Sequence, residues 1–366
     1  TELRVCNVIW TGDWPREIPS LDDQELVLDE TGFLDERLPE LTAVFSHDFP
    51  DKGLPLDRFA VIRGNPEHLV SGPEGLRAWR QAEGGYRNAS VSPILQVGGD
   101  FDIAGMRVAL SIAGSDPTGG AGPQQDLQVF RALGVHGAGV VTALTVQDTQ
   151  KVHRVLPAFP SVVSDQLRAL LADVVPAAVK LGMLASDDVL RAVALGLETL
   201  PEPRPLVIDP VLRASDGTLL LERRAWPGLL DLMRGATLVT PNLPEAEELT
   251  SCDVSTRRGV ERAARWLLDE TGAGAVLVKG GHRDGAPDDC FAEREEDGVA
   301  ISWLPGERIE GAPVHGTGCA LSAAIAAALA RGEALERAVA TGRAFVREAI
   351  ARAEAVGGGA RVLGLG

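Results

Sequence analysis

Two different patterns of hydrophobic and polar residues divide this chain near residue 105. From Met106 onward, short and continuously apolar runs alternate with longer segments in which apolar residues recur every three or four positions. The short runs predict strands that are buried on both faces, and the longer segments predict amphipathic helices. Strands and helices that alternate in this way form a mostly parallel sheet with helices on both faces. The pattern therefore predicts an α/β domain over residues 105–366.

The expected elements of this domain can be placed from the pattern alone. The predicted strands are residues 107–114, 137–146, 177–184, 205–212, 236–243 and 274–281. The predicted helices are residues 124–134, 161–174, 186–200, 244–251 and 256–272, followed by C-terminal helices that include an alanine-rich run. Ligands of such sheets bind where the strands end and lead into helices. The glycine-rich end, residues 357–366, is expected to be a frayed tail.

Residues 1–104 follow another pattern, in which turn sequences often interrupt the apolar runs. Residues 3–10, 59–64 and 93–97 are expected to be strands, and residues 73–82 are expected to be a helix. This segment contains 9 basic and 19 acidic residues up to Asp102 and three of the six tryptophans, which we interpret as core residues. The shift predicts a separate small α/β or α+β domain of unknown function.

Composition and charge limit the classes of partner. Hydrophobic residues make up 45% of the chain and charged residues 24%, as is typical of globular proteins. The formal net charge of -17 disfavours nucleic acid and anionic membranes as partners. The four cysteines are far apart in the sequence, which favours neither a zinc site nor a disulfide framework. The sequence has no long uncharged apolar run and no signal-peptide pattern, so we expect a cytoplasmic protein.

A Gly-Thr-Gly-Cys turn stands directly before the alanine-rich helix. Gly316 and Gly318 bracket Thr317, so backbone N–H groups can turn inward at the amino end of the helix. The helix adds partial positive charge there, and the two features together predict an anion site. Cys319 lies where the pKa of a thiol can be lowered, so it could be a thiolate base or a polar group beside a transferring phosphoryl group. From these residues alone, a glycine-rich loop with a small buried cysteine is the favoured interpretation.

A second glycine-rich turn lies in residues 113–126, after the first predicted strand of the domain. It lacks the G-x-x-x-x-G-K-[ST] pattern, which excludes a Walker-type phosphate loop. Asp126 could hold a substrate hydroxyl there, or could be a solvated acid that favours the helix dipole. Gln147 ends the next strand with an amide that can donate and accept on the edge of a heterocycle. Lys180 and Met183 flank a further strand end, where Met183 could line a flat ligand or pack in the core.

Polar side chains also stand at the ends of the later predicted strands. Asp209 ends one strand, and Asn242 and Glu245 lie on a loop that enters a helix. Acids and an amide at these ends suit a Mg²⁺ ion that keeps several waters and bridges nucleotide phosphates. Lys279 follows another strand, where its charge could offset phosphate or could simply face solvent.

Taken in order, these motifs resemble one known family. The hydroxymethylpyrimidine/phosphomethylpyrimidine kinases of thiamine biosynthesis carry, in the same order, counterparts of SIAGSDPTGGAGPQQDL, GVVTALTVQDT, KLGML, VIDPV, TPNLPEAEEL, VLVKGGH and HGTGCALSAAIAAALA. The resemblance covers Met106 to about Ala355 and implies the three-layer sandwich of the ribokinase-like superfamily. It also implies ATP- and Mg²⁺-dependent phosphorylation of 4-amino-5-hydroxymethyl-2-methylpyrimidine, and then of its monophosphate.

The resemblance also implies a role for each candidate residue. The pyrimidine pocket would be formed by Gln147, which reads the aminopyrimidine, with Gly114, Asp126, Met183 and Val211. The migrating phosphoryl charge would be held by Gly316, Gly318 and the N–H of Cys319, whose side chain would activate the substrate hydroxyl. The metal and its waters would be organised by Asp209 and Glu245 together with Asn242. The ATP side of the site would be formed by Lys279, Asn242 and Thr317.

Four positions depart from the family pattern. They are Pro123, Gln125, Asp148 and Leu212, and the resemblance implies that they surround the substrate pocket, where they bear most on the second phosphorylation. Because ribokinase-like enzymes commonly form dimers, we expect a homo-oligomer. Two alternatives remain open. One is a pyridoxal/pyridoxine kinase, which would share the Gly-Thr-Gly-Cys turn, and the other is a non-catalytic pyrimidine sensor whose acidic N-terminal segment engages a partner.

Overall fold

The computed structural model describes residues 4–10, 41–46, 59–64, 107–200, 204–281, 285–295 and 298–365. The chain divides into two compact units, Thr1–Gly105 and Met106–Gly366. In the first unit, the described residues form an antiparallel sheet in the order β1-β2-β3, with β1 at Arg4–Trp10, β2 at Leu41–Ser46 and β3 at Phe59–Gly64. The strands expected at 3–10 and 59–64 are confirmed, and β2 has no counterpart among the expected strands. The strand expected at 93–97 and the helix expected at 73–82 lie outside the described residues.

The second unit is built on one sheet, of which nine strands are described. Their order across the sheet is β12-β11-β10-β9-β8-β7-β4-β5-β6. In chain order they are β4 (Val108–Ser115), β5 (His136–Gln147), β6 (Val152–Pro157), β7 (Ala178–Leu181), β8 (Leu206–Ile208), β9 (Leu238–Val239), β10 (Ala275–Val278), β11 (Asp289–Glu295) and β12 (Gly298–Leu304).

The interior of this sheet is parallel and its edges are antiparallel. From β10 to β5, every neighbouring pair of strands is parallel, whereas β6, β11 and β12 pair antiparallel at the two edges. The first strand, β4, lies between β5 and β7, so the chain leaves β4 towards one edge and later returns to its other side. Ligands of open α/β sheets bind at such a reversal, outside the carboxyl ends of the strands. The turn of residues 113–126 leaves β4 at this point.

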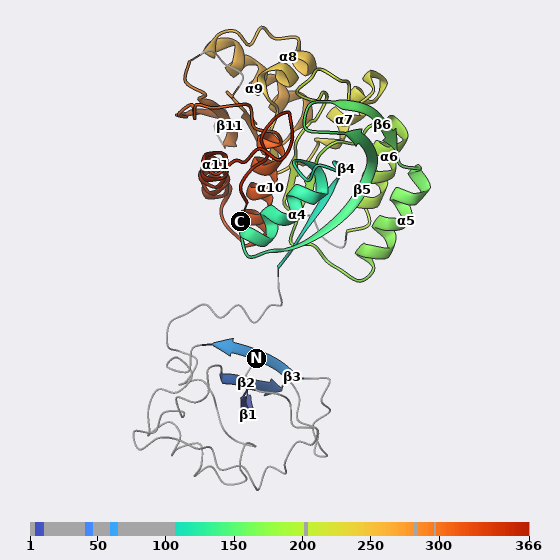
Figure 1. The fold of residues 1–366 in the computed structure, drawn as a ribbon, viewed down its shortest axis with the longest axis vertical. Coiled ribbons are helices and arrows are strands. Elements are labelled where there is room, and N and C mark those ends of the chain that lie inside the picture. The colour runs from blue at the N-terminus through green and yellow to red at the C-terminus, as the bar shows by residue number, and fades with distance from the viewer. Residues whose placement is uncertain are drawn as a thin grey trace. The chain divides into compact units, whose positions relative to one another are not determined.

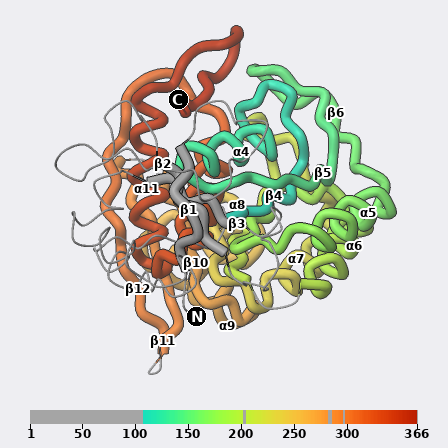
Figure 2. The backbone as a smooth tube through the Cα atoms, turned by 90° about the horizontal axis from the view of Figure 1, so that it is seen from below, coloured from blue at the N-terminus to red at the C-terminus, as the bar shows by residue number. Residues whose placement is uncertain are grey.

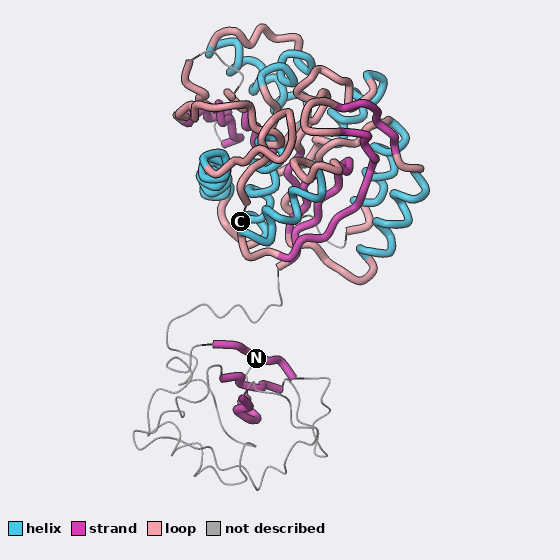
Figure 3. The backbone as a smooth tube through the Cα atoms, in the orientation of Figure 1, coloured by secondary structure: helices cyan, strands magenta, loops and turns pink. Residues whose placement is uncertain are grey.

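Helices cover both faces of the sheet (Figures 1 and 2). One face carries α4 (Gly122–Ala132), α10 (Thr317–Ala330) and α11 (Leu335–Ala351). The other carries α5 (Pro160–Leu171), α6 (Asp187–Leu197), the 3-10 turn η4 (Arg223–Ala225), α7 (Trp226–Leu232), α8 (Leu243–Thr250) and α9 (Arg257–Thr271). Figure 3 shows these layers by element type. The predicted three-layer α/β sandwich is confirmed. None of the described helices has both the length and the apolar character that a bilayer crossing requires.

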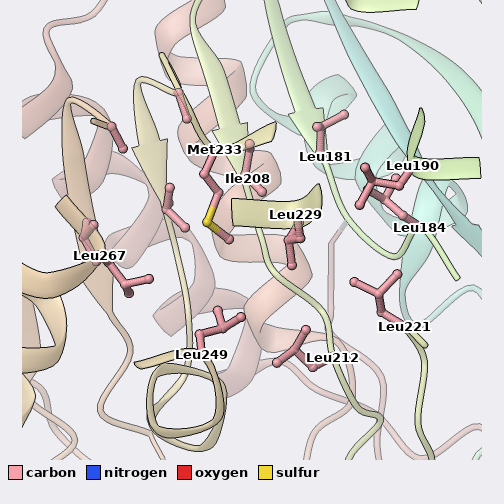
Figure 4. Close-up of a cluster of buried hydrophobic side chains, with 14 of the residues drawn as sticks. Leu181, Leu184, Leu190, Ile208, Leu212, Leu221, Leu229, Met233, Leu249 and Leu267 are labelled. Atoms are coloured by element: carbon pink, nitrogen blue, oxygen red, sulfur yellow. The ribbon is translucent and has the colours of Figure 1, made fainter. Parts of the chain in front are cut away.

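Apolar strand residues explain why the sheet is covered on both sides. Leu181 and Ile208 from β7 and β8 pack with Leu190, Leu229 and Met233 of the helix layer in one continuous core (Figure 4). On the opposite face, α10 is buried along nearly its whole length, and its alanines let it lie close to the sheet and to α4 and α11. This close packing fixes the amino end of α10 against the carboxyl ends of the strands.

The C-terminal segment is ordered against the domain, which contradicts the expectation of a frayed tail. The N–H of Ala360 donates to the carbonyl of Thr149 at 2.8 Å, and the N–H of Arg361 donates to that of Pro313 at 2.9 Å. Val362 pairs with Glu354 in a short antiparallel bridge, and Leu363 is buried. Backbone hydrogen bonds to two loops outweigh the flexibility that the glycines would otherwise confer.

Candidate active site

The amino end of α10 forms the centre of the site. Gly316 is the N-cap of α10 in a left-handed conformation, with φ 74° and ψ 13°. A β-carbon at Gly316 would collide with the carbonyl oxygen of Gly120 and would stand 2.6 Å from Nε2 of Gln125. A β-carbon at Gly318 would stand 3.0 Å from Nζ of Lys279. Gly316 is therefore required by its backbone conformation and by the neighbouring backbone, whereas at Gly318 the close neighbour is the end of the Lys279 side chain. With glycine at both positions, no side chain covers the N–H groups that begin α10.

Asp209 and Lys279 meet directly beside Gly318. Nζ of Lys279 donates to Oδ1 of Asp209 at 2.6 Å, and Oγ1 of Thr240 donates to the same oxygen at 3.2 Å. Burial alone would lower the pKa of Lys279, but the charges of Asp209 and Glu245 outweigh it and raise that pKa. The ammonium group is thus held charged next to the anion site, as phosphate binding requires.

Asn242 and Glu245 form a capping box at the start of α8. The N–H of Glu245 donates to Oδ1 of Asn242 at 2.9 Å, and the N–H of Asn242 donates to Oε2 of Glu245 at 2.8 Å. Asn242 also forms a bridge with Lys279, which brings α8 to the carboxyl end of β10. Burial raises the pKa of Glu245 to about 7, while Lys279 lowers it and Asp209 raises it further. Both residues have a structural role in addition to the one that the sequence implied.

The two carboxylates fit a Mg²⁺ ion that is shared with phosphate. Mg²⁺ in nucleotide sites is held by one or two carboxylates, with waters and phosphate oxygens completing its coordination. Asp209 and Glu245 are buried and close enough for their charges to interact. Within the described residues, no group of three or more His, Cys, Asp or Glu side chains could form a metal site from protein ligands alone. The donor set therefore fits a metal that arrives with a nucleotide.

An apolar wall lies beside the first glycine-rich turn. A β-carbon at Gly114 would stand 2.7 Å from Sδ of Met183, so the thioether lies directly on the backbone of this turn. Met183 belongs to a small buried cluster with Ala143, and Val211 packs against the same cluster. Three residues that the resemblance assigned to the pyrimidine pocket are therefore side by side.

Asp126 is fully buried and paired, so the interpretation of a solvated acid is wrong. Its Oδ2 accepts from Nζ of Lys180 at 2.7 Å and from Oγ of Ser111 at 2.5 Å. Its Oδ1 is buried and has no hydrogen-bond partner in the protein. Burial raises the pKa of Asp126, although Lys180 and Ser111 act in the opposite direction. Oδ1 is therefore a buried acceptor without a partner among the described residues.

Cys319 lies in the first turn of α10, where it is partly exposed. Removal of the thiol from water raises its pKa to about 11; Lys180 and Lys279 act to lower it, and Asp209 and Asp126 act to raise it. The direction is opposite to the lowered pKa that the helix end alone suggested, which leaves the second interpretation, a polar group beside the anion site. The neutral thiol remains a weak hydrogen-bond donor beside the anion site.

Two of the four departures from the family pattern have clear partners in the fold. The side chain of Leu212 is fully buried in the main core, while its backbone N–H donates to the carboxylate of Glu245. Asp148 is exposed and paired with His153 at 2.7 Å. Pro123 and Gln125 are buried in α4, and neither amide atom of Gln125 has a hydrogen-bond partner in the protein. The unpaired amide lies against Gly316.

Two residues that the sequence did not single out connect the pyrimidine side to the phosphoryl side. Nε2 of His315 lies 2.8 Å from Oδ2 of Asp116 and 3.1 Å from Nε2 of Gln147. Asp116 is on the first glycine-rich turn, and His315 directly precedes Gly316. The only signal in the sequence is that both residues lie inside glycine-rich motifs. Thr317 opens α10 between Gly316 and Gly318.

Comparison with known proteins identifies the family. Residues 116–363 match the family model described as phosphomethylpyrimidine kinase. A hydroxymethylpyrimidine/phosphomethylpyrimidine kinase of Rhizobium meliloti (strain 1021) is 43% identical over 250 residues, which are 68% of this chain and 91% of that protein. This chain belongs to the phosphomethylpyrimidine kinase family. The predicted family is thereby confirmed.

Solved structures of related kinases have the same fold. Phosphomethylpyrimidine kinase from Clostridium difficile 630 is 34% identical, with a TM-score of 0.59 over 67% of this chain and 99% of that chain. Pyridoxal kinase from Staphylococcus aureus in complex with ADP is 29% identical, with a TM-score of 0.65 over 71% of this chain and 93% of that chain. The fold is therefore ribokinase-like, as predicted. A second family model, the C domain of a protein of unknown function (DUF1583), matches residues 21–121.

Proposed function

We propose that this kinase transfers phosphate from ATP to the hydroxymethyl group of 4-amino-5-hydroxymethyl-2-methylpyrimidine, and then to the resulting monophosphate. Family membership supports the substrate class, and ADP bound to the related pyridoxal kinase supports an adenine nucleotide as donor. One observation supports phosphoryl transfer at this site. Gly318 lies between the open amino end of α10 and the Asp209–Lys279 pair, so backbone donors and an ammonium group converge on one point.

The residues at this point would act by position and charge. The N–H groups of Gly318 and Cys319 would hold the negative charge of the phosphoryl group in transfer, as donors fixed before the reaction begins. The ammonium of Lys279, 2.6 Å from Asp209, would neutralise phosphate charge without having to move far. Phosphoryl transfer depends mostly on such positioning and electrostatic stabilisation. Cys319 would orient the substrate hydroxyl as a neutral thiol.

Asp209 and Glu245 would hold Mg²⁺. The ion would supply positive charge that offsets the phosphates of the nucleotide. Asn242 would keep Glu245 in place through the capping box, and Thr317 would face the nucleotide from the start of α10. Gly114, Met183 and Val211 would line the heterocycle as an apolar wall, while Gln147 reads its edge.

Pyridoxal kinase activity is the second candidate. It is favoured by one observation, since the S. aureus pyridoxal kinase has the higher TM-score of the two structures compared, 0.65 against 0.59. The sequence identities favour the pyrimidine instead, at 34% for the C. difficile phosphomethylpyrimidine kinase against 29%. The thioether of Met183 and the amide of Gln147 suit either ring. The two functions are therefore distinguished by the rates at which the protein phosphorylates the hydroxymethylpyrimidine and pyridoxal.

The direct test is turnover by the purified protein with ATP and Mg²⁺, with products followed by phosphorus NMR. We expect the alcohol to give the monophosphate and the monophosphate to give the diphosphate. The Lys279→Met variant should lose about 100-fold in rate, because an ammonium aimed at the developing charge is removed. Lys151→Met, which alters an exposed lysine, is the matched control and should keep wild-type turnover. An inactive wild-type protein on both compounds would refute the proposal.

We further propose that the enzyme is a cytoplasmic homo-oligomer. ATP as the donor and unpaired cysteines in the described residues are compatible with the cytoplasm. Exposed apolar side chains gather on β5, β6 and the start of α5, namely Leu144, Val146, Leu156, Phe159 and Val162, and these support association between copies. Light scattering of the purified chain would give the molar mass, and a monomer at micromolar concentration would contradict the oligomer.

A further inference from the structure

The His315 imidazole joins three segments that are distant in the sequence. Its Nε2 contacts Asp116 of the first glycine-rich turn and Gln147 at the end of β5, at 2.8 and 3.1 Å. A β-carbon at Gly120 would stand 2.7 Å from Cδ2 of His315, so the ring lies on that glycine. The N–H of His315 donates to the carbonyl of Arg361 at 2.8 Å. The ring is therefore held from several sides directly before the anion site.

Asp116 determines which atom of His315 carries a proton. The carboxylate also accepts from the N–H of Thr118 at 2.9 Å and from its Oγ1 at 3.0 Å. Burial would raise the pKa of Asp116, but these bonds and the contact with His315 lower it overall. An ionised carboxylate has only acceptors, so Nε2 of His315 must carry the hydrogen that lies between them.

This assignment determines which atom of the Gln147 amide can face His315. A protonated Nε2 cannot accept from the –NH₂ group of Gln147, since two donors cannot bond to each other. The contact is favourable when the Gln147 amide turns through 180°, so that its Oε1 faces His315. Oε1 of Gln147 and Oδ2 of Asp116 then both accept from the Nε2–H of His315. The –NH₂ group is then free to donate to a ligand.

We propose that His315 is a positioning residue for substrate recognition, which orients the Gln147 amide so that its –NH₂ group donates to a ring nitrogen of the substrate heterocycle. The inference rests on the proposed substrate class. It adds that the heterocycle accepts a hydrogen bond from Gln147, and that the residue which orients Gln147, His315, directly precedes Gly316 on the phosphoryl-binding turn.

Binding measured by calorimetry on the full chain tests the proposal separately from turnover. The ligand is 4-amino-5-hydroxymethyl-2-methylpyrimidine, and the variants are His315→Leu, Gln147→Ala and the double variant. Each single variant should weaken binding about tenfold, the worth of one neutral hydrogen bond. The double variant should be no weaker than Gln147→Ala, because His315 acts through Gln147. The KM for ATP should stay within about twofold in His315→Leu if the ring acts on the pyrimidine through Gln147, because the backbone N–H groups that begin α10 are kept.

A conservative variant separates positioning from packing. In His315→Gln an amide nitrogen can replace the ring N–H, so this variant should bind the pyrimidine at least threefold more tightly than His315→Leu. Equal losses in the two variants would overturn the proposal, as would additive losses in the double variant.

Ligand analogues test the same point on the wild-type protein. Two pyridine analogues each replace one ring nitrogen of the pyrimidine by C–H, and we expect one of them to bind about tenfold more weakly. Unchanged binding of both would overturn the proposal. Turnover is a separate readout: a wild-type protein that binds the pyrimidine as described but does not phosphorylate it would refute the proposed function and leave the role of His315 supported. A wild-type protein that does not bind it would overturn both.

Discussion

At the residue scale, the pKa of the Cys319 thiol is lowered by Lys180 and Lys279 and raised by Asp209 and Asp126. Desolvation then decides the outcome and raises the pKa to about 11. The thiol is therefore protonated at neutral pH in the free enzyme. A protonated thiol can hydrogen-bond to the substrate hydroxyl, but the stabilisation of phosphoryl charge comes from backbone N–H groups that any residue at this position would keep.

Replacement of Cys319 by alanine should slow the chemical step without affecting the nucleotide. We expect Cys319→Ala to lower kcat about 10- to 100-fold, the lower part of the range for a group that assists proton transfer. The KM for ATP should change less than about twofold, because α10 keeps its N–H groups. Steady-state kinetics measure both, with Cys252→Ala as control, since Cys252 is a free cysteine beyond α8. An equal loss of kcat and ATP affinity would contradict this account.

The raised pKa of Cys319 also predicts how it reacts. Only the thiolate is alkylated, so the iodoacetamide reaction rate should keep rising with pH up to about pH 10. Peptide mass spectrometry isolates the Cys319 signal from the other cysteines. A rate that levels off near pH 7 would show that the helix end dominates and that the thiolate forms at neutral pH.

Some of these residues could be predicted from sequence and others could not. Asp209 and Lys279 follow buried parallel strands, whose carboxyl ends must meet at one edge, so their proximity was predictable. The pairing of Asp126 with Lys180 was not predictable, because each of these two side chains could equally have faced water. His315 and Asp116 lie 199 residues apart and meet only because the second glycine-rich turn folds onto the first.

At the element scale, three structures position the site: α10, the capping box of α8 and the C-terminal segment. The alanine run of α10 predicted a closely packed helix, and the structure buries it between α4, α11 and the sheet. The capping box could be read from Asn242 and Glu245 at their spacing of three. The role of residues 357–363 could not be predicted from the sequence. Their glycine content predicted flexibility and gave no information on the partners Thr149 and Pro313.

Removal of the C-terminal segment should weaken pyrimidine binding more than ATP binding. A chain that stops at Ala355 loses backbone bonds to Thr149, Pro313 and His315, and the burial of Leu363. We expect a loss of about 3–5 kcal/mol in the free energy of unfolding from those bonds and that side chain. The KM for the pyrimidine should rise about tenfold. Denaturant unfolding and steady-state kinetics measure the two effects.

Leu363→Ala is the matched control for this truncation. It removes buried apolar surface but keeps the backbone bonds, so stability should fall by about 2–4 kcal/mol with little change in KM. A truncated enzyme whose KM for the pyrimidine matches that of Leu363→Ala would show that the segment only stabilises the fold.

At the scale of the whole molecule, the proposed site residues and the hydrophobic clusters of the described residues lie within residues 107–365. The sequence predicted the domain boundary near residue 105 from a change in pattern and charge, and we propose that the two parts are separate domains. We expect residues 106–366 alone to unfold cooperatively and to keep turnover within about threefold, because this unit is compact and contains the sheet, its helices and the proposed site residues. Calorimetry and kinetics of this fragment provide the test. An insoluble, inactive fragment would make the N-terminal unit part of the kinase.

The central claim is that the site selects an aminopyrimidine alcohol. The most direct measurement places equal concentrations of the hydroxymethylpyrimidine and pyridoxal with ATP, Mg²⁺ and enzyme in one vessel, and compares the initial rates of the two phosphorylated products. This ratio equals the ratio of the two kcat/KM values. We predict that the pyrimidine product forms at least about tenfold faster, the discrimination expected from one specific hydrogen bond. Faster formation of pyridoxal phosphate would contradict the account.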